Sequence, residues 1–111
     1  MPRDSSAYLD DILDAIGAIR QYTGDLSRKD FGQDRKTVDA VLRNLEVIGE
    51  AVKQLPVEVR SAHPDVEWQK IAGLRDILIH ACFGVDLDIV WDVVSNKLPA
   101  VETRIRTILG S

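Results

Sequence analysis

The sequence predicts an all-helical protein, and two observations carry that prediction. Apolar residues recur every three or four positions over most of the chain, which is the period of an amphipathic helix. Glycine and proline are sparse and fall between these periodic segments. Hydrophobic residues make up 45% of the 111 residues, enough for one core, so we expect a single domain over residues 1–111.

The periodic segments predict three long helices, over residues 6–22, 34–54 and 65–83. Two short connecting helices are expected over residues 27–31 and 56–62. Gly24 is expected to end the first helix in the left-handed conformation. A last apolar stretch begins after Asp86, whose side chain can cap a helix. Pro99 then either starts a final helix or kinks one long helix. The expected architecture is a bundle of four main helices with short helical connectors.

A second stripe along the helix over residues 34–54 is polar, and we interpret it as a solvated face with intrahelical ion pairs. It consists of Asp39, Arg43, Glu46, Glu50 and Lys53. Asn44 is different, because it lies beside the apolar stripe of the same helix, where a buried amide needs hydrogen-bond partners.

Composition excludes several classes of protein. One cysteine cannot form an internal disulfide, and neither zinc-ligand spacing nor a glycine-rich phosphate loop is present. The net charge of −4 argues against a broad basic face for nucleic acid, although it leaves room for a small basic cleft. No apolar run approaches the ~20 residues that span a membrane, and acidic residues occupy the place of a signal peptide's apolar core. We therefore expect a cytoplasmic protein with no membrane contact.

The segment that is hardest to interpret as ordinary packing covers residues 74–86, LRDILIHACFGVD. Arg75 offers a planar cation suited to a phosphate, and His80 can exchange a proton near neutral pH. Cleavage of RNA needs a base for the 2′-hydroxyl proton and a cation for the developing charge, and no metal is required in principle. Arg75 and His80 are therefore candidate catalytic groups, with no metal ligand and no cofactor indicated.

Ideal helix geometry limits this interpretation, because Arg75 and His80 are five residues apart and point about 140° apart around a helix. A single site would need a loosened helix near His80, or residues from a second subunit. The alternative from spacing alone is structural. Arg75 would pair with Asp76 or with a carboxylate of the 34–54 helix, His80 would be a satisfied core residue, and Cys82 would be a buried, inert thiol.

Three stretches together resemble the HepT-like branch of the HEPN superfamily: AYLDDILDAI, DAVLRNLEVIGEAVKQLP, and W-x-x-IAGLRDILIHACFGVDLDIVW. They cover nearly the whole chain. An arginine and a histidine separated by four residues would be a weak motif alone. Here the motif lies after RNLEVIGEA at the distance that is usual in this family.

The resemblance implies a homodimeric HEPN-type helical bundle in which Arg75 and His80 of both chains line a cleft at the dimer interface. It implies a metal-independent ribonuclease that acts on RNA, with tRNA as one candidate substrate, as the toxin of a toxin-antitoxin pair. Its partner would be an antitoxin nucleotidyltransferase of the MntA type. Asp76 matches the polar residue that commonly follows the arginine, and Asn44 and Glu50 match polar positions expected to support the cleft.

The sequence departs from the family at Cys82, which stands where the partner would transfer AMP to a tyrosine. Tyr8 and Tyr22 do not match that position. The antitoxin could control this chain by direct binding, the chain could be a weakened toxin, or the cysteine could have little consequence.

Two other functions remain open at this stage. The chain could be a non-enzymatic dimeric module that binds nucleotide or a nucleotidyltransferase, which the acidic charge and Cys82 favour. It could also be a purely structural dimer in which Arg75 and His80 belong to an internal network.

Overall fold

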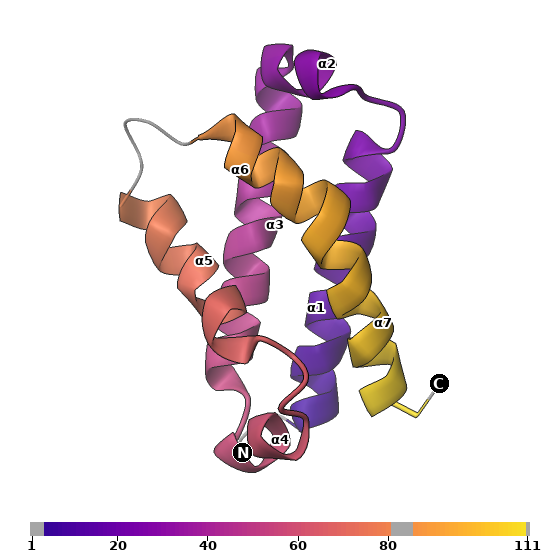
Figure 1. The fold of residues 1–111 in the computed structure, drawn as a ribbon, viewed down its shortest axis with the longest axis vertical. Helices are drawn as coiled ribbons and strands as arrows, with labels where there is room; N and C mark the ends of the chain where they lie inside the picture. Colours follow the sequence, from indigo (N-terminus) through magenta and orange to yellow (C-terminus); the bar gives the residue numbers. More distant parts are fainter. Residues whose placement is uncertain (1–3, 81–85, 111) are drawn as a thin grey trace.

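The computed structural model describes the backbone of residues 4–80 and 86–110 and the side chains of residues 4–74 and 86–110. Every regular element in these ranges is a helix, which confirms the predicted all-helical class. The order is α1 (Ser5–Thr23), α2 (Arg28–Gln33), α3 (Arg35–Gln54), α4 (Val57–Ala62), α5 (Trp68–His80), α6 (Leu87–Asp92), the π-helical segment η1 (Val93–Lys97) and α7 (Leu98–Ile108) (Figure 1).

Short polar side chains start several helices by accepting hydrogen bonds from backbone N–H groups that have no partner inside the helix. Asp34 caps α3 through the N–H of Thr37, at 3.2 Å. Asp86 caps α6 through two N–H groups, as predicted, the closer bond being 2.9 Å. Ser27 caps α2 through the N–H of Asp30.

Helix α3 is the centre of the bundle, because it packs against α1 along one side and against α5 along another (Figure 1). The apolar stripes of α1 and α3 supply most of the fully buried side chains: Ile12, Ile16, Ile19, Val41, Leu45, Ile48 and Val52. The motif helix α5 is therefore placed by burial of its apolar residues against α3.

The last part of the chain is one continuous helical segment whose middle is π-helical. The N–H of Leu98 bonds to the carbonyl of Val93, five residues back. Pro99, which has no backbone N–H to donate, follows in the first turn of α7. Pro99 thus starts the final helix without separating it from the one before.

Two contacts join α2 to α6. Arg28 pairs with Asp88 at 2.6 Å, and the rings of Phe31 and Trp91 meet with centroids 5.1 Å apart. Trp68 is buried in the core, and Trp91 is half-buried and packs against this core.

Two local predictions were wrong. Gly24 ends α1 with φ −55°, so it adopts a right-handed and not a left-handed conformation. Helix α5 starts at Trp68 and not at Asp65, because the chain turns after His63: the N–H of Val66 bonds back to the His63 carbonyl at 3.2 Å. Within the described residues, no helix is long and apolar enough to cross a membrane.

Candidate functional site

Helix α5 carries the candidate catalytic residues, and its first half is firmly packed. Trp68 and Ile71 are buried, with 6% and 7% of their surface exposed. The indole N–H of Trp68 donates to the carbonyl of His63 at 2.9 Å, which ties the start of α5 to the turn that precedes it. The helix therefore holds Arg75 and His80 in a register set by apolar packing against α3.

The backbone of α5 stays α-helical through His80. Arg75 and His80 are thus separated by about 7.5 Å along the helix axis and by about 140° around it. The loosened helix considered from the sequence is not present at either backbone position. The side chains of Arg75, Asp76 and His80, and all of Cys82, lie outside the described residues, so their expected roles stay predictions.

The two supporting residues predicted on α3 are not brought together by the fold. Asn44 is half-buried and donates from its amide to the carbonyl of Ala40 at 2.9 Å, one turn earlier in α3. This bond supplies the partner that a buried amide was expected to need. Glu50 is exposed and accepts from the amide of Gln54 at 3.2 Å. Six residues separate Asn44 from Glu50, so they lie about 120° apart around the helix.

Four of the five residues of the predicted solvated stripe of α3 are exposed, namely Asp39, Arg43, Glu50 and Lys53, whereas Glu46 is half-buried. Arg43 pairs with Glu46 at 3.7 Å, and Asp39 accepts from Arg35 at 3.3 Å. These pairs are intrahelical, as the spacing predicted.

A groove of about 480 Å³ runs between α5 and the η1–α7 segment, and we call it the α5–α7 groove. Its apolar lining consists of Val66, Ile71, Leu74, Val93, Leu98, Ala100 and Val101. Its polar lining consists of Asp65, Glu67, Lys70, Asn96, Lys97 and Arg104. Leu74 directly precedes Arg75, so the groove runs along the helix that carries the motif.

Sequence reasoning missed this groove. Lys97 and Arg104 belong to a different helical segment from Arg75, and only their basic character could have drawn attention to them. The ammonium of Lys70 lies 3.0 Å from the carboxylate of Glu67. That hydrogen bond and charge lower the pKa of Glu67, and the charge of Lys97 lowers it further. Glu67 therefore stays ionised at neutral pH.

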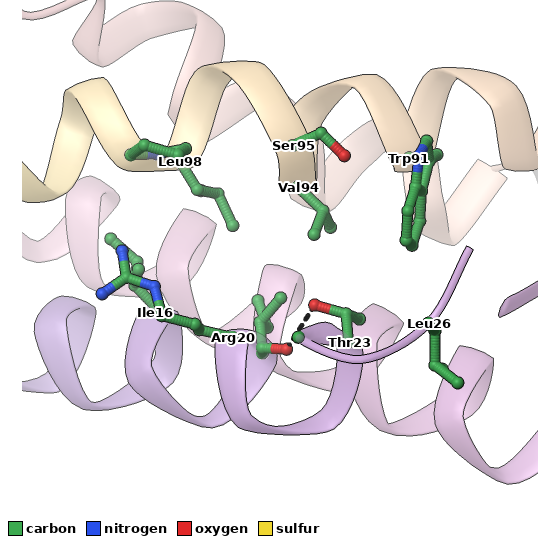
Figure 2. Close-up of a pocket in the computed structure, with 11 residues that line it drawn as sticks. Ile16, Arg20, Thr23, Leu26, Trp91, Val94, Ser95 and Leu98 are labelled. Atoms are coloured by element: carbon green, nitrogen blue, oxygen red, sulfur yellow. Dashed lines mark hydrogen bonds between the residues drawn. The ribbon is translucent and has the colours of Figure 1, made fainter. Parts of the chain in front are cut away.

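A smaller pocket of about 220 Å³ lies between α1 and the α6–η1–α7 segment (Figure 2). Its apolar lining includes Ile16 and Ile19 of α1, and Figure 2 shows Ile16 on the side of the pocket opposite Val94 and Leu98. The Thr23 hydroxyl donates to the carbonyl of Ile19 at 2.8 Å. In the part of the chain that the structure describes, no group of three His, Cys, Asp or Glu residues could hold a metal ion.

Comparisons with known proteins agree on one family. The family described as "Ribonuclease HepT-like" matches residues 12–108. A Methanocaldococcus jannaschii protein named "Putative RNase MJ0127" is 48% identical, covering 99% of this chain and 95% of its own length. A Thermococcus cleftensis protein named "Probable ribonuclease HepT" is 41% identical over 94% of each chain. No solved structure gives a significant match.

Proposed function

Because the chain belongs to the HepT-like ribonuclease family, we propose that it is a ribonuclease whose catalytic groups are Arg75 and His80. The observation that carries this proposal is the family match over residues 12–108, which includes the whole of α5. The names of the two relatives, both of which match nearly the full chain, support the same activity.

The chemistry of these two side chains suits RNA cleavage without a metal. The neutral imidazole of His80 takes the proton from a ribose 2′-hydroxyl, and the oxygen attacks the adjacent phosphorus. The bond to the 5′-oxygen breaks, that oxygen takes a proton from an imidazolium, and a 2′,3′-cyclic phosphate remains. The guanidinium of Arg75 binds the non-bridging oxygens and stabilises the charge that develops on them.

A homodimer is part of the proposal, because the helical backbone through His80 separates Arg75 and His80 around the axis of one helix. A two-fold axis beside α5 would bring Arg75 of one protomer towards His80 of the other. In this arrangement Asp76 supports Arg75, and Asn44 and Glu50 of α3 support the walls of the cleft.

We further propose that the chain is the toxin of a toxin-antitoxin pair and acts on cytoplasmic RNA, with tRNA as one candidate substrate. Its activity would be controlled by an MntA-type nucleotidyltransferase. Cys82 replaces the tyrosine that would receive AMP. A thiol does not offer the phenolic oxygen of that reaction, so control of this chain would be by direct binding of the antitoxin.

The decisive experiment compares RNA cleavage by the purified wild-type chain, a His80→Ala variant and a His63→Ala variant. His63 is the other histidine of the chain, and its described hydrogen bonds are made by its backbone and not by its side chain. We expect His80→Ala to slow cleavage by about 10²- to 10⁴-fold, His63→Ala to leave the rate unchanged, and EDTA to have no effect on the wild type.

Equal cleavage by His80→Ala would refute the catalytic role of that residue. Absence of cleavage by a folded wild type, together with tight binding of nucleotide or of the nucleotidyltransferase, would replace the ribonuclease by a non-enzymatic binding module.

A second experiment tests the control mechanism through growth of a bacterial host. The wild type and a Cys82→Tyr variant are each expressed with and without the nucleotidyltransferase. Direct binding predicts protection of both versions by the partner, whereas protection of the Cys82→Tyr version alone would show that control requires AMP transfer.

A further inference from the structure

We propose that the α5–α7 groove binds the RNA backbone beside the cleaved phosphodiester, with Lys97 and Arg104 as the phosphate-binding side chains. This inference rests on the proposed ribonuclease function, and it names the surface that would hold the substrate strand.

Position is the first argument. Ile71 and Leu74 line the groove and lie on the same helix as Arg75, and Leu74 is its direct neighbour in the chain. A strand lying in the groove would therefore pass along α5 towards the candidate catalytic arginine. The opposite wall is formed by η1 and α7, from which Lys97 and Arg104 line the groove.

Charge is the second argument. The described residues that line the groove include three cationic side chains and two carboxylates. Each carboxylate is matched by one cation: Glu67 by Lys70 at 3.0 Å, and Asp65 by Arg104 at 2.9 Å. Lys97 makes no ion pair with any residue that the structure describes. The described lining therefore carries one positive charge in excess, whereas the net charge of the whole chain is −4.

The two proposed phosphate ligands remain available to a ligand. Lys97 is exposed and lines the groove from the wall opposite Glu67. Arg104 is 58% exposed and uses Nη1 for Asp65. A guanidinium has five N–H donors, so others are free to bind a phosphate oxygen.

The apolar lining of the groove determines how well the groove can distinguish one RNA base from another. Half-buried apolar side chains such as Leu74, Val93 and Val101 offer surface to sugars and base faces but no hydrogen bonds to base edges. None of the described residues that line the groove is aromatic, so these residues offer no ring for strong stacking of bases. We therefore expect the groove to bind single-stranded RNA through its backbone, with little base preference.

The test separates binding from cleavage by using the His80→Ala protein and a fluorescent 12-nucleotide RNA of mixed sequence. Its dissociation constant is measured as a function of salt concentration. Loss of one phosphate contact to single-stranded nucleic acid lowers the salt slope by about 0.7 and weakens binding about fivefold near 100 mM salt. We expect this result for Lys97→Ala, and about twice the change in slope for Lys97→Ala combined with Arg104→Ala.

Lys29→Ala is the matched control, because it removes the same charge from an exposed lysine of α2, at the opposite end of the bundle from the start of α5 (Figure 1). Glu67→Gln should have the opposite effect to Lys97→Ala and tighten binding, since it removes a carboxylate from the same lining. Thermal unfolding of every variant verifies that the fold is retained.

The inference is overturned if Lys97→Ala and Lys29→Ala bind RNA with the same affinity and salt slope. It is also overturned if Lys97→Ala dissociates a dimer in size-exclusion chromatography without changing RNA affinity, because the groove is then covered by a second copy. Failure of the ribonuclease function is a separate result: wild-type protein that binds RNA through Lys97 but cuts none.

Discussion

Arg20 of α1 donates a hydrogen bond to the carboxylate of Glu102 in α7, 82 residues later in the chain. The Glu102 side chain is only 12% exposed, and Arg106 binds its other oxygen at 3.4 Å. These contacts link the first helix of the bundle to the last and satisfy a carboxylate that would otherwise be costly to bury. α7 is thereby held against α1, which keeps it in place as one wall of the α5–α7 groove.

Replacement of Glu102 by glutamine should lower the free energy of unfolding by about 1 kcal/mol, because both arginines are more than half exposed and are solvated in the variant. Urea unfolding at neutral pH measures this change. Asp39→Asn provides the control, since it breaks the exposed Arg35–Asp39 pair within one helix and should change stability by less than about 0.5 kcal/mol. Equal effects of the two substitutions would contradict the proposed linking role.

The contribution of Glu102 should depend on pH. The hydrogen bond from Arg20, which outweighs the effect of burial, lowers the pKa of Glu102 below its ordinary value of 4.5. The folded state thus binds this proton less readily than the unfolded state, so the stabilisation is complete above pH 4.5 and is lost as the pH falls through the folded pKa. The stability difference between wild type and Glu102→Gln should shrink as the pH falls through the range below 4.5. A difference that stays constant over this range would contradict the assignment.

Phe31→Ala should lower the free energy of unfolding by about 3–5 kcal/mol, since the side chain is fully buried and its ring packs against Trp91. Trp91 fluorescence and far-UV circular dichroism during urea unfolding measure the loss. Tyr22→Ala is the control for removal of an aromatic ring, because Tyr22 is 44% exposed and its loss should cost about 0.5 kcal/mol or less.

Trp68→Phe should destabilise the protein by about 1–2 kcal/mol more than Trp91→Phe does, as measured by thermal or urea unfolding. Both substitutions shrink an indole ring to a phenyl ring. Only the first removes a described indole hydrogen bond, the one to the His63 carbonyl, and so leaves a part-buried acceptor without that partner. Similar losses for both variants would indicate that ring size and not this bond holds the start of α5.

Helix positions could be predicted well from sequence wherever apolar periodicity and a capping residue agree. Residues 34–54 were expected to be helical, and α3 spans Arg35–Gln54 with Asp34 as its cap. The start of α5 was placed three residues too early. Periodicity alone did not reveal the turn in which the carbonyl of His63 accepts bonds from both Val66 and Trp68.

The candidate site was predictable only in part. Arg75 and His80 could be recognised from the motif and its family context, because both lie in one short stretch of chain. Lys97 and Arg104 could not be connected with them, since they lie on a helical segment whose contact with α5 depends on the packing of the entire bundle.

The sequence by itself therefore determined the helical class, most helix boundaries and the family, because these follow from local periodicity, capping residues and a contiguous motif. Only the tertiary structure decided which helices face each other. It placed α3 between α1 and α5, joined Arg20 to Glu102, and opened a groove with Lys97 on one wall and Leu74 on the other. The physical reason is that periodicity identifies the apolar side of each helix, whereas the partner of that side is set by how all the apolar surfaces are buried together.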